Sequence, residues 1–110
     1  MTDIRLIATD LDGTLLDPTG RISATDAQAL LDAAAAGVVV VVATGRPLRW
    51  LRCLAPIADA DPLVVASNGA AVYDLHHDRV LLQHPLDPEL IGEIAEELAA
   101  QVPGLMFAVE

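Results

Sequence analysis

The chain has 110 residues, 54% of them hydrophobic, which is enough to form the core of one domain of ordinary size. Sixteen acidic residues against six basic ones give a net charge of −10, which argues against a nucleic acid or an anionic membrane as partner. A single cysteine excludes an internal disulfide, and the longest apolar stretch (residues 33–43) is too short to span a bilayer. The N-terminus lacks the basic flank of a signal peptide. The sequence therefore predicts a cytoplasmic protein.

Two aspartates, Asp10 and Asp12, follow an apolar strand that we expect over residues 4–8. In an extended strand, side chains two residues apart project to the same side, about 6.5 to 7 Å apart at roughly 3.3 Å of rise per residue. Gly13 lets the backbone turn sharply and approach a ligand closely. The spacing therefore allows two carboxylates to act on one substrate atom.

This segment has two other interpretations. Asp12 and Gly13 between apolar residues are also typical of a hairpin turn. A calcium loop of the EF-hand type starting at Asp10 would need Gly at its sixth position and an acid at its twelfth, but Leu15 and Arg21 stand there. The calcium loop is therefore excluded.

Small polar residues also follow two later apolar runs. Residues 38–43 form an unbroken apolar run ending in Thr44, Gly45 and Arg46, and residues 63–66 are followed by the string SNGA. The first run predicts a strand of a parallel sheet covered on both faces. Asn68 and Gly69 also indicate a hairpin turn, and both interpretations stay open. Three strand ends then point to one edge of an α/β sheet, where such sheets bind ligands.

The string DLDGT after an apolar strand resembles the first motif of the haloacid dehalogenase (HAD) superfamily, whose members are mostly magnesium-dependent phosphatases and phosphomutases. The SNGA string resembles the Cof-like, C2-capped subgroup. The resemblance implies that Asp10 attacks phosphorus to form an aspartyl-phosphate, that Asp12 acts as acid and base, and that Mg²⁺ is held by Asp10 and the backbone carbonyl of Asp12. The resemblance also implies phosphate and substrate contacts from Thr44, Gly45, Arg46, Asn68 and Gly69.

Part of the family's site has no counterpart in this sequence. The third motif normally supplies a basic residue, usually Lys, but the chain has no lysine. No segment after Ala70 resembles the acidic fourth motif, and Asp59 and Asp61 come before the third strand. We therefore expect the chain to match only the first part of a family member.

The resemblance implies an α/β fold with a Rossmann-like parallel sheet and helices on both faces, incomplete, followed by the start of an inserted α/β cap. We assign residues 1–85 to the N-terminal part of the HAD-like core and residues 86–110 to the beginning of the cap. The local patterns predict these elements: a flap hairpin turning at residues 17–20, a helix from Ser23 to Gly37, a helix over residues 47–57, a hairpin with its tip at His76 and His77, a helix from Asp87 with the apolar stripe Leu90, Ile94 and Leu98, and a strand over residues 105–109.

Other polar residues receive structural interpretations. We favour solvated turn residues over metal ligands for His76 and His77. For Arg49 and Arg52, a solvated helix face is favoured over contact with a substrate phosphate. Trp50 is predicted to be a packing residue.

The sequence thus predicts a phosphatase-type hydrolase acting on a small phosphorylated metabolite, such as a sugar phosphate. A phosphomutase remains an alternative, as does a catalytically silent fragment or interaction module. A receiver-like signalling domain is disfavoured because it would need a Lys near its end. We also expect self-association, through an exposed first strand (residues 4–8) or through the apolar stripe on the last helix.

Overall fold

The computed structural model describes residues 3–110, which form five strands and several helical segments. The strands are β1 (Leu6–Asp10), β2 (Val39–Ala43), β3 (Leu63–Ala66), β4 (Ala71–Asp74) and β5 (Arg79–Gln83). The helical segments are η1 (Leu11–Leu15), α1 (Ala24–Ala35), η2 (Leu48–Ala60), η3 (Ser67–Gly69) and α2 (Pro88–Gln101). Within these residues, no helix combines the length and the apolar character needed to cross a bilayer.

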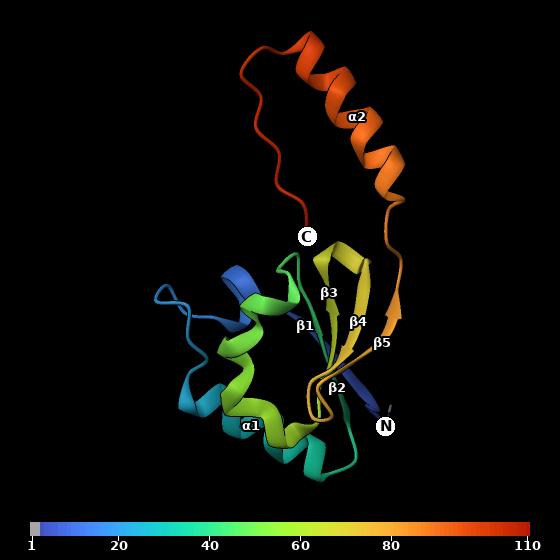
Figure 1. The fold of residues 1–110 in the computed structure, drawn as a ribbon. Helices are drawn as coiled ribbons and strands as arrows, with labels where there is room; N and C mark the ends of the chain where they lie inside the picture. Colours follow the sequence, from blue (N-terminus) through green and yellow to red (C-terminus); the bar gives the residue numbers. More distant parts are fainter. Residues whose placement is uncertain (1–2) are drawn as a thin grey trace.

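The strands form a single sheet in which their spatial order is their order in the sequence, β1-β2-β3-β4-β5 (Figure 1). β1, β2 and β3 are parallel, whereas β4 and β5 run antiparallel to their neighbours. The α/β fold is as predicted, but the sheet is parallel only over its first three strands. The chain reverses at residues 67–70, so the hairpin interpretation of Asn68 and Gly69 is confirmed.

The core lies between the sheet and a layer formed by α1 and η2, which cover the same face (Figure 1). Val40, Val42 and Val64 point into this layer, and Leu54 of η2 is fully buried against it. On the opposite face, Leu6 and Val39 are 53% and 46% exposed. Within residues 3–110 only one face has helical cover, so the predicted fold is present in an incomplete form.

Local hydrogen bonds explain where the elements begin and end. Ser23 Oγ accepts the Asp26 N–H at 3.0 Å and starts α1, while Gly37 ends it with a φ of +86°. Asp17 accepts the N–H groups of Thr19 and Arg21, which closes the predicted flap hairpin. The second predicted helix is longer than expected and is wound as a 3₁₀ helix, η2.

The last part of the chain differs from the rest. α2 and residues 102–110 project from the sheet, and the molecule measures 56 × 29 × 28 Å (Figure 1). Asp87 starts α2 as predicted, by accepting the Glu89 N–H at 2.8 Å. Residues 105–109 form no strand, contrary to the prediction, because no neighbouring strand pairs with them.

Candidate active site

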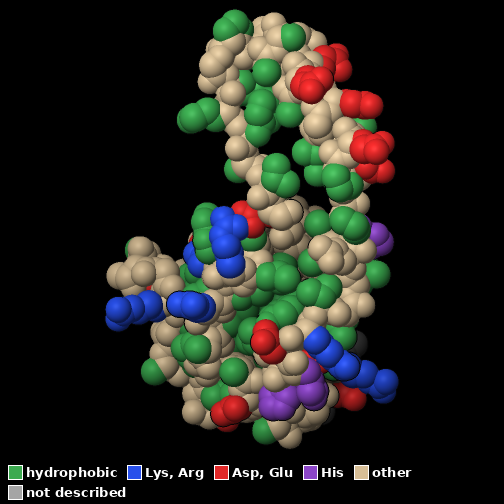
Figure 2. Space-filling model, viewed as in Figure 1, with side chains coloured by type: hydrophobic (Ala, Val, Ile, Leu, Met, Phe, Trp, Pro, Cys, Tyr) green, Lys and Arg blue, Asp and Glu red, His purple; other side chains and the backbone are tan. Residues whose placement is uncertain are grey.

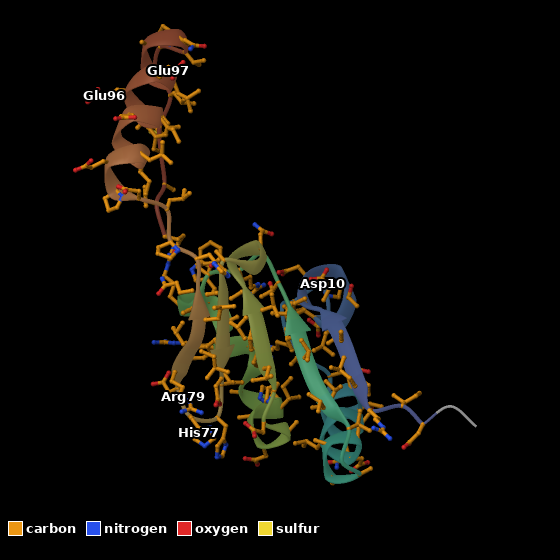
Figure 3. The ribbon with its side chains drawn as sticks, turned by 90° about the vertical axis from the view of Figure 1, so that its right-hand side faces the viewer. Asp10, His77, Arg79, Glu96 and Glu97 are labelled. Atoms are coloured by element: carbon orange, nitrogen blue, oxygen red, sulfur yellow. The ribbon has the colours of Figure 1, made fainter. Side chains whose placement is uncertain are left out.

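Asp10 is the last residue of β1 and lies beside Ala43, the last residue of β2. Its Oδ1 accepts the Leu11 N–H at 2.8 Å. The chain turns immediately afterwards, so Asp12 belongs to the turn, and Gly13 has a φ of +75°. Figure 3 shows Asp10 at the end of the sheet from which α2 projects. The two carboxylates are thus presented by a strand end and the turn that follows it.

Arg46 and Asp12 form a bidentate ion pair. Arg46 Nε donates to Asp12 Oδ2 at 2.8 Å and Nη2 donates to Oδ1 at 2.6 Å. Nη1 lies 3.4 Å from the Trp50 carbonyl oxygen and 3.6 Å from Cys53 Sγ, which hold the guanidinium in place. This fork geometry is the strongest kind of charged hydrogen bonding between side chains. It joins the turn after β1 to the loop after β2.

The ion pair sets the protonation state of Asp12. The Arg46 guanidinium holds the pKa of the Asp12 carboxyl below its ordinary value, mainly through the hydrogen bond between them. The Asp12 side chain is 60% exposed, so burial does not overcome this effect. The pKa of Arg46 is raised by the same contact. Asp12 is therefore ionised at neutral pH while the pair is intact.

The loops after β2 and β3 are hydrogen-bonded to each other. The Ser67 N–H donates to the Arg46 carbonyl at 3.0 Å, and the Asn68 N–H donates to the Thr44 carbonyl at 3.2 Å. A Cβ at Gly45 would lie 2.9 Å from the Asn68 Oδ1, so only glycine fits there without moving the amide. Four of the predicted substrate-binding residues, Thr44, Gly45, Arg46 and Asn68, are therefore brought together.

The Thr44 side chain suits a role in anion binding. It is buried, with 6% of its surface exposed, and its Oγ1 accepts the Arg46 N–H at 3.0 Å. That acceptor bond leaves the hydroxyl hydrogen to donate to a ligand oxygen. Asn68 adopts a left-handed conformation with a φ of +54°, and Gly69 follows at +96°. These dihedrals form the tight turn that aims the loop at Gly45.

Arg49 has a structural partner that sequence reasoning missed. It pairs with the Glu110 carboxylate near the end of the chain, and its guanidinium lies 5.1 Å from the centre of the Trp50 ring. Arg49 thus lies on an exposed helix face, as predicted, but it is paired with a carboxylate there, and Trp50 is 57% exposed beneath its guanidinium. No local pattern could have indicated Glu110, because the contact depends on how α2 and the tail are placed.

A second polar cluster lies at the opposite end of the sheet, around Asp74, His77 and Arg79 (Figure 3). The Asp74 carboxylate accepts the His77 N–H at 3.0 Å, lies 2.9 Å from His77 Nδ1 and 3.4 Å from Arg79 Nε. Asp61 is near enough to complete a group of potential metal ligands. The hydrogen bonds and the adjacent Arg79 account for the buried Asp74 carboxylate without a metal. The interpretation of His77 as a turn residue stands.

A family model described as haloacid dehalogenase-like hydrolase matches residues 7–109. The chain belongs to this family. The predicted resemblance is thereby confirmed, and it accounts for the strand ends that carry the candidate site.

Several members of the HAD-like hydrolases are similar in sequence. The 5-amino-6-(5-phospho-D-ribitylamino)uracil phosphatase YcsE of Bacillus subtilis (strain 168) is 38% identical over 78 residues, covering 71% of this chain and 31% of the relative. The pyridoxal phosphate phosphatase YbhA of Escherichia coli (strain K12) is 32% identical over 104 residues, covering 94% of this chain and 38% of the relative.

The fold matches solved structures over the same extent. The crystal structure of SMU.1108c from Streptococcus mutans UA159 superposes with a TM-score of 0.78 at 27% identity, covering 93% of this chain and 38% of that one. A haloacid dehalogenase-like hydrolase from B. subtilis gives a TM-score of 0.75 at 31% identity, covering 89% and 34%. The chain thus spans between 31% and 38% of the length of these four proteins.

The HAD-like site offers oxygen donors of the type that Mg²⁺ prefers. Asp10 Oδ1 already accepts a backbone N–H, but its second oxygen accepts no such bond from residues 3–110, and Asp12 follows with a backbone carbonyl in the turn. Hard oxygen ligands in a near-octahedral arrangement are the usual environment of this ion. The donors therefore fit magnesium in kind, although they are few.

Proposed function

We propose that the complete protein to which this HAD-like chain corresponds is a magnesium-dependent phosphatase of a small phosphorylated metabolite. One observation carries the proposal: the ends of β1, β2 and β3 are joined into one site, by the Arg46–Asp12 pair and by the hydrogen bonds between the Thr44 and Ser67 loops. The similarity to YcsE and YbhA, both named as phosphatases of phosphorylated metabolites, supports it.

The proposed reaction has two steps. In the first, the Asp10 carboxylate attacks phosphorus, the bond to the leaving oxygen breaks, and Asp12 donates a proton to that oxygen. In the second, water attacks the aspartyl-phosphate and gives its proton to Asp12, which releases phosphate and restores both carboxyl groups. Thr44 donates its hydroxyl to a phosphate oxygen and fixes the orientation of the group. A bound Mg²⁺ would neutralise negative charge on the phosphate and on Asp10.

Arg46 links substrate binding to the protonation of Asp12. In the structure the guanidinium is committed to the Asp12 carboxylate, which keeps that group ionised. A phosphate bound beside Thr44 competes for the same guanidinium, and its capture frees Asp12 from the interaction that lowers its pKa. Arg46 therefore serves as the cationic phosphate contact in a chain that has no lysine.

The division of the chain is part of the same proposal. Residues 1–85 form the first part of the catalytic core, and residues 86–110 begin a cap that shields the substrate. The projection of α2 from the end of the sheet at which Asp10 lies supports this division (Figure 3).

The test is hydrolysis of a generic phosphate ester by the complete protein with magnesium. Asp10→Asn keeps the shape of the side chain but cannot attack phosphorus, so kcat/KM should fall by about a thousandfold or more. Asp32→Asn, an acid on α1 bonded to Gln28, is the matched control and should leave the rate unchanged. Full turnover by the Asp10→Asn variant would remove Asp10 as nucleophile.

A catalytically silent 110-residue chain is the second candidate, and the missing lysine favours it. Arg46 is the only cation bonded to Asp12 within residues 3–110, and the described part of the chain supplies few magnesium ligands. We expect the isolated chain to show no turnover. Magnesium-dependent hydrolysis by the purified chain, abolished by Asp10→Asn, would contradict this expectation.

A further inference from the structure

A pocket of about 660 Å³ lies between the carboxyl end of the sheet, α2 and the last residues of the chain. Its volume is in the range of sites for small molecules, roughly 300 to 1,000 Å³. Figure 1 shows the tail returning from α2 toward the sheet, and residues of the sheet end, α2 and the tail all line the pocket. Its place in the fold makes it a candidate for ligand binding.

The walls of the pocket are mostly apolar. The core contributes Leu48, the segment before α2 contributes Leu86, α2 contributes Ile94 and Leu98, and the tail contributes Phe107. In Figure 2, hydrophobic side chains line the inner side of α2, and acidic ones occupy its outer side. A polyhydroxylated sugar would find partners only at the few polar lining residues, among them Ser67, Gln83 and His84, and its remaining hydroxyl groups would lack partners, which is costly.

The pocket continues the candidate active site. Pro47 and Ser67 are among its lining residues, and they are the direct neighbours of Arg46 and Asn68. The loops that carry the phosphate contacts therefore also form the floor of the pocket. A phosphate group beside Thr44 would leave its organic part room to extend between Leu48 and α2.

One wall of the pocket carries the positive charge of Arg49. Arg49 lines the pocket and holds a carboxylate, that of Glu110, on the same wall. Its side chain is 57% exposed, so the guanidinium is open to exchange with another anion. The guanidinium lies over the Trp50 ring, and a stacked guanidinium presents its N–H donors at its edge. The Glu110 carboxylate thus marks a position that suits an anionic group.

We propose that this pocket binds the organic part of the substrate, and that this part is mainly apolar and carries a second anionic group that pairs with Arg49 in place of Glu110. The inference rests on the proposed phosphatase function and narrows its substrate class. It replaces the sugar phosphate expected from the sequence with a phosphate ester of an apolar, preferably planar, acid.

The test measures binding to the 110-residue chain by NMR titration with magnesium present, using phenyl phosphate, para-carboxyphenyl phosphate, glucose phosphate and benzoate as probes. We expect para-carboxyphenyl phosphate to bind about fivefold more tightly than phenyl phosphate, as a partly exposed charged pair would provide, and glucose phosphate to bind most weakly. Glu110→Gln should make para-carboxyphenyl phosphate bind still more tightly, because the substitution removes the competing carboxylate.

Two arginine variants distinguish a specific contact made by Arg49 from a general effect of positive charge on this helix. Arg49→Gln should abolish the preference for the carboxylated probe and leave phenyl phosphate unaffected. Arg52→Gln, on the same helix but outside the lining of the pocket, is the matched control and should change neither. Tightest binding of glucose phosphate, or a carboxylate preference that survives in Arg49→Gln, overturns the inference.

A third variant distinguishes failure of the inference from failure of the proposed function. If phosphate probes all bind alike and lose affinity in Thr44→Val, the phosphate site stands and the inference about Arg49 is overturned. If benzoate binds as well as para-carboxyphenyl phosphate, depends on Arg49 and ignores Thr44→Val, the Arg49 subsite is supported and the phosphatase proposal fails.

Discussion

The chain up to Asp74 and the chain after it are built from similar residues but are packed very differently. All fully buried side chains lie in the first region, and Asp74 is the last buried residue. In the second region, β5 is exposed along its whole length and α2 buries no residue. An amphipathic pattern therefore predicts that a segment has an apolar face, but it does not tell whether the chain itself supplies the partner.

Two leucines on helical segments offer the sharpest test of this difference. Leu54 in η2 is fully buried, whereas Leu98 in α2 is 39% exposed. Leu54→Ala should lower the free energy of unfolding by about 2 to 5 kcal/mol, because it leaves a cavity in the core. Leu98→Ala should cost less than about 1 kcal/mol. Urea denaturation measures both, and equal losses would show that α2 is packed as firmly as the core.

Self-association tests whether the second region finds its partner in another copy. β1 is an edge strand, as predicted, and Leu90, Ile94 and Leu98 are exposed on α2. We expect the average mass in sedimentation to rise with concentration. Ile94→Glu should suppress the rise if the helix stripe is the contact, and Leu6→Lys should suppress it if β1 is. A monomer at all concentrations would contradict both routes.

Removing the helix caps compares the two regions through smaller changes in stability. Ser23 caps α1, which packs on the core, and Asp87 caps α2, which does not. Ser23→Ala should lower global stability by about 1 kcal/mol. Asp87→Ala should leave the global transition unchanged and reduce helical circular dichroism, because fraying of α2 is uncoupled from the core. A shared loss of global stability would show that the two regions unfold together.

Acid should weaken the first region through Asp74. The His77 N–H and its ring hold the pKa of Asp74 below its ordinary value of 3.8. A lowered pKa in the folded state contributes stability that is fully present above 3.8 and is lost as the pH falls through the folded value. Urea midpoints between about pH 5 and pH 2 should decline in the wild type and less in Asp74→Asn. Equal declines would exclude Asp74 as a source.

The sequence predicted the elements whose signals are local. Ser23, Gly37 and Asp87 were assigned from capping chemistry, and the hairpins from their turns. The three strand ends of the candidate site followed from apolar runs that stop at small polar residues. These features depend on a few consecutive residues, and tertiary packing did not alter them.

Features that depend on a distant partner were not predictable in the same way. Both Arg46 and Arg49 follow β2, yet one pairs with Asp12 and the other with Glu110. The choice is made by the positions of a turn and a tail far away in the sequence. Residues 105–109 have the composition of a strand, but a strand also requires a neighbour with free backbone groups.

The spatial order of the sheet, identical to the order of its strands in the sequence, bears on how the molecule assembles. β3, β4 and β5 are joined by short turns, so they can pair through contacts between residues close in the sequence. β1 is separated from β2 by α1, and Leu6 pairs with Val39 only after α1 has formed. Closing long loops slows folding, so the docking of β1 should set the rate. Asp10 is carried on that strand. The hairpins can therefore form early, but the candidate nucleophile reaches its place only in the slowest step.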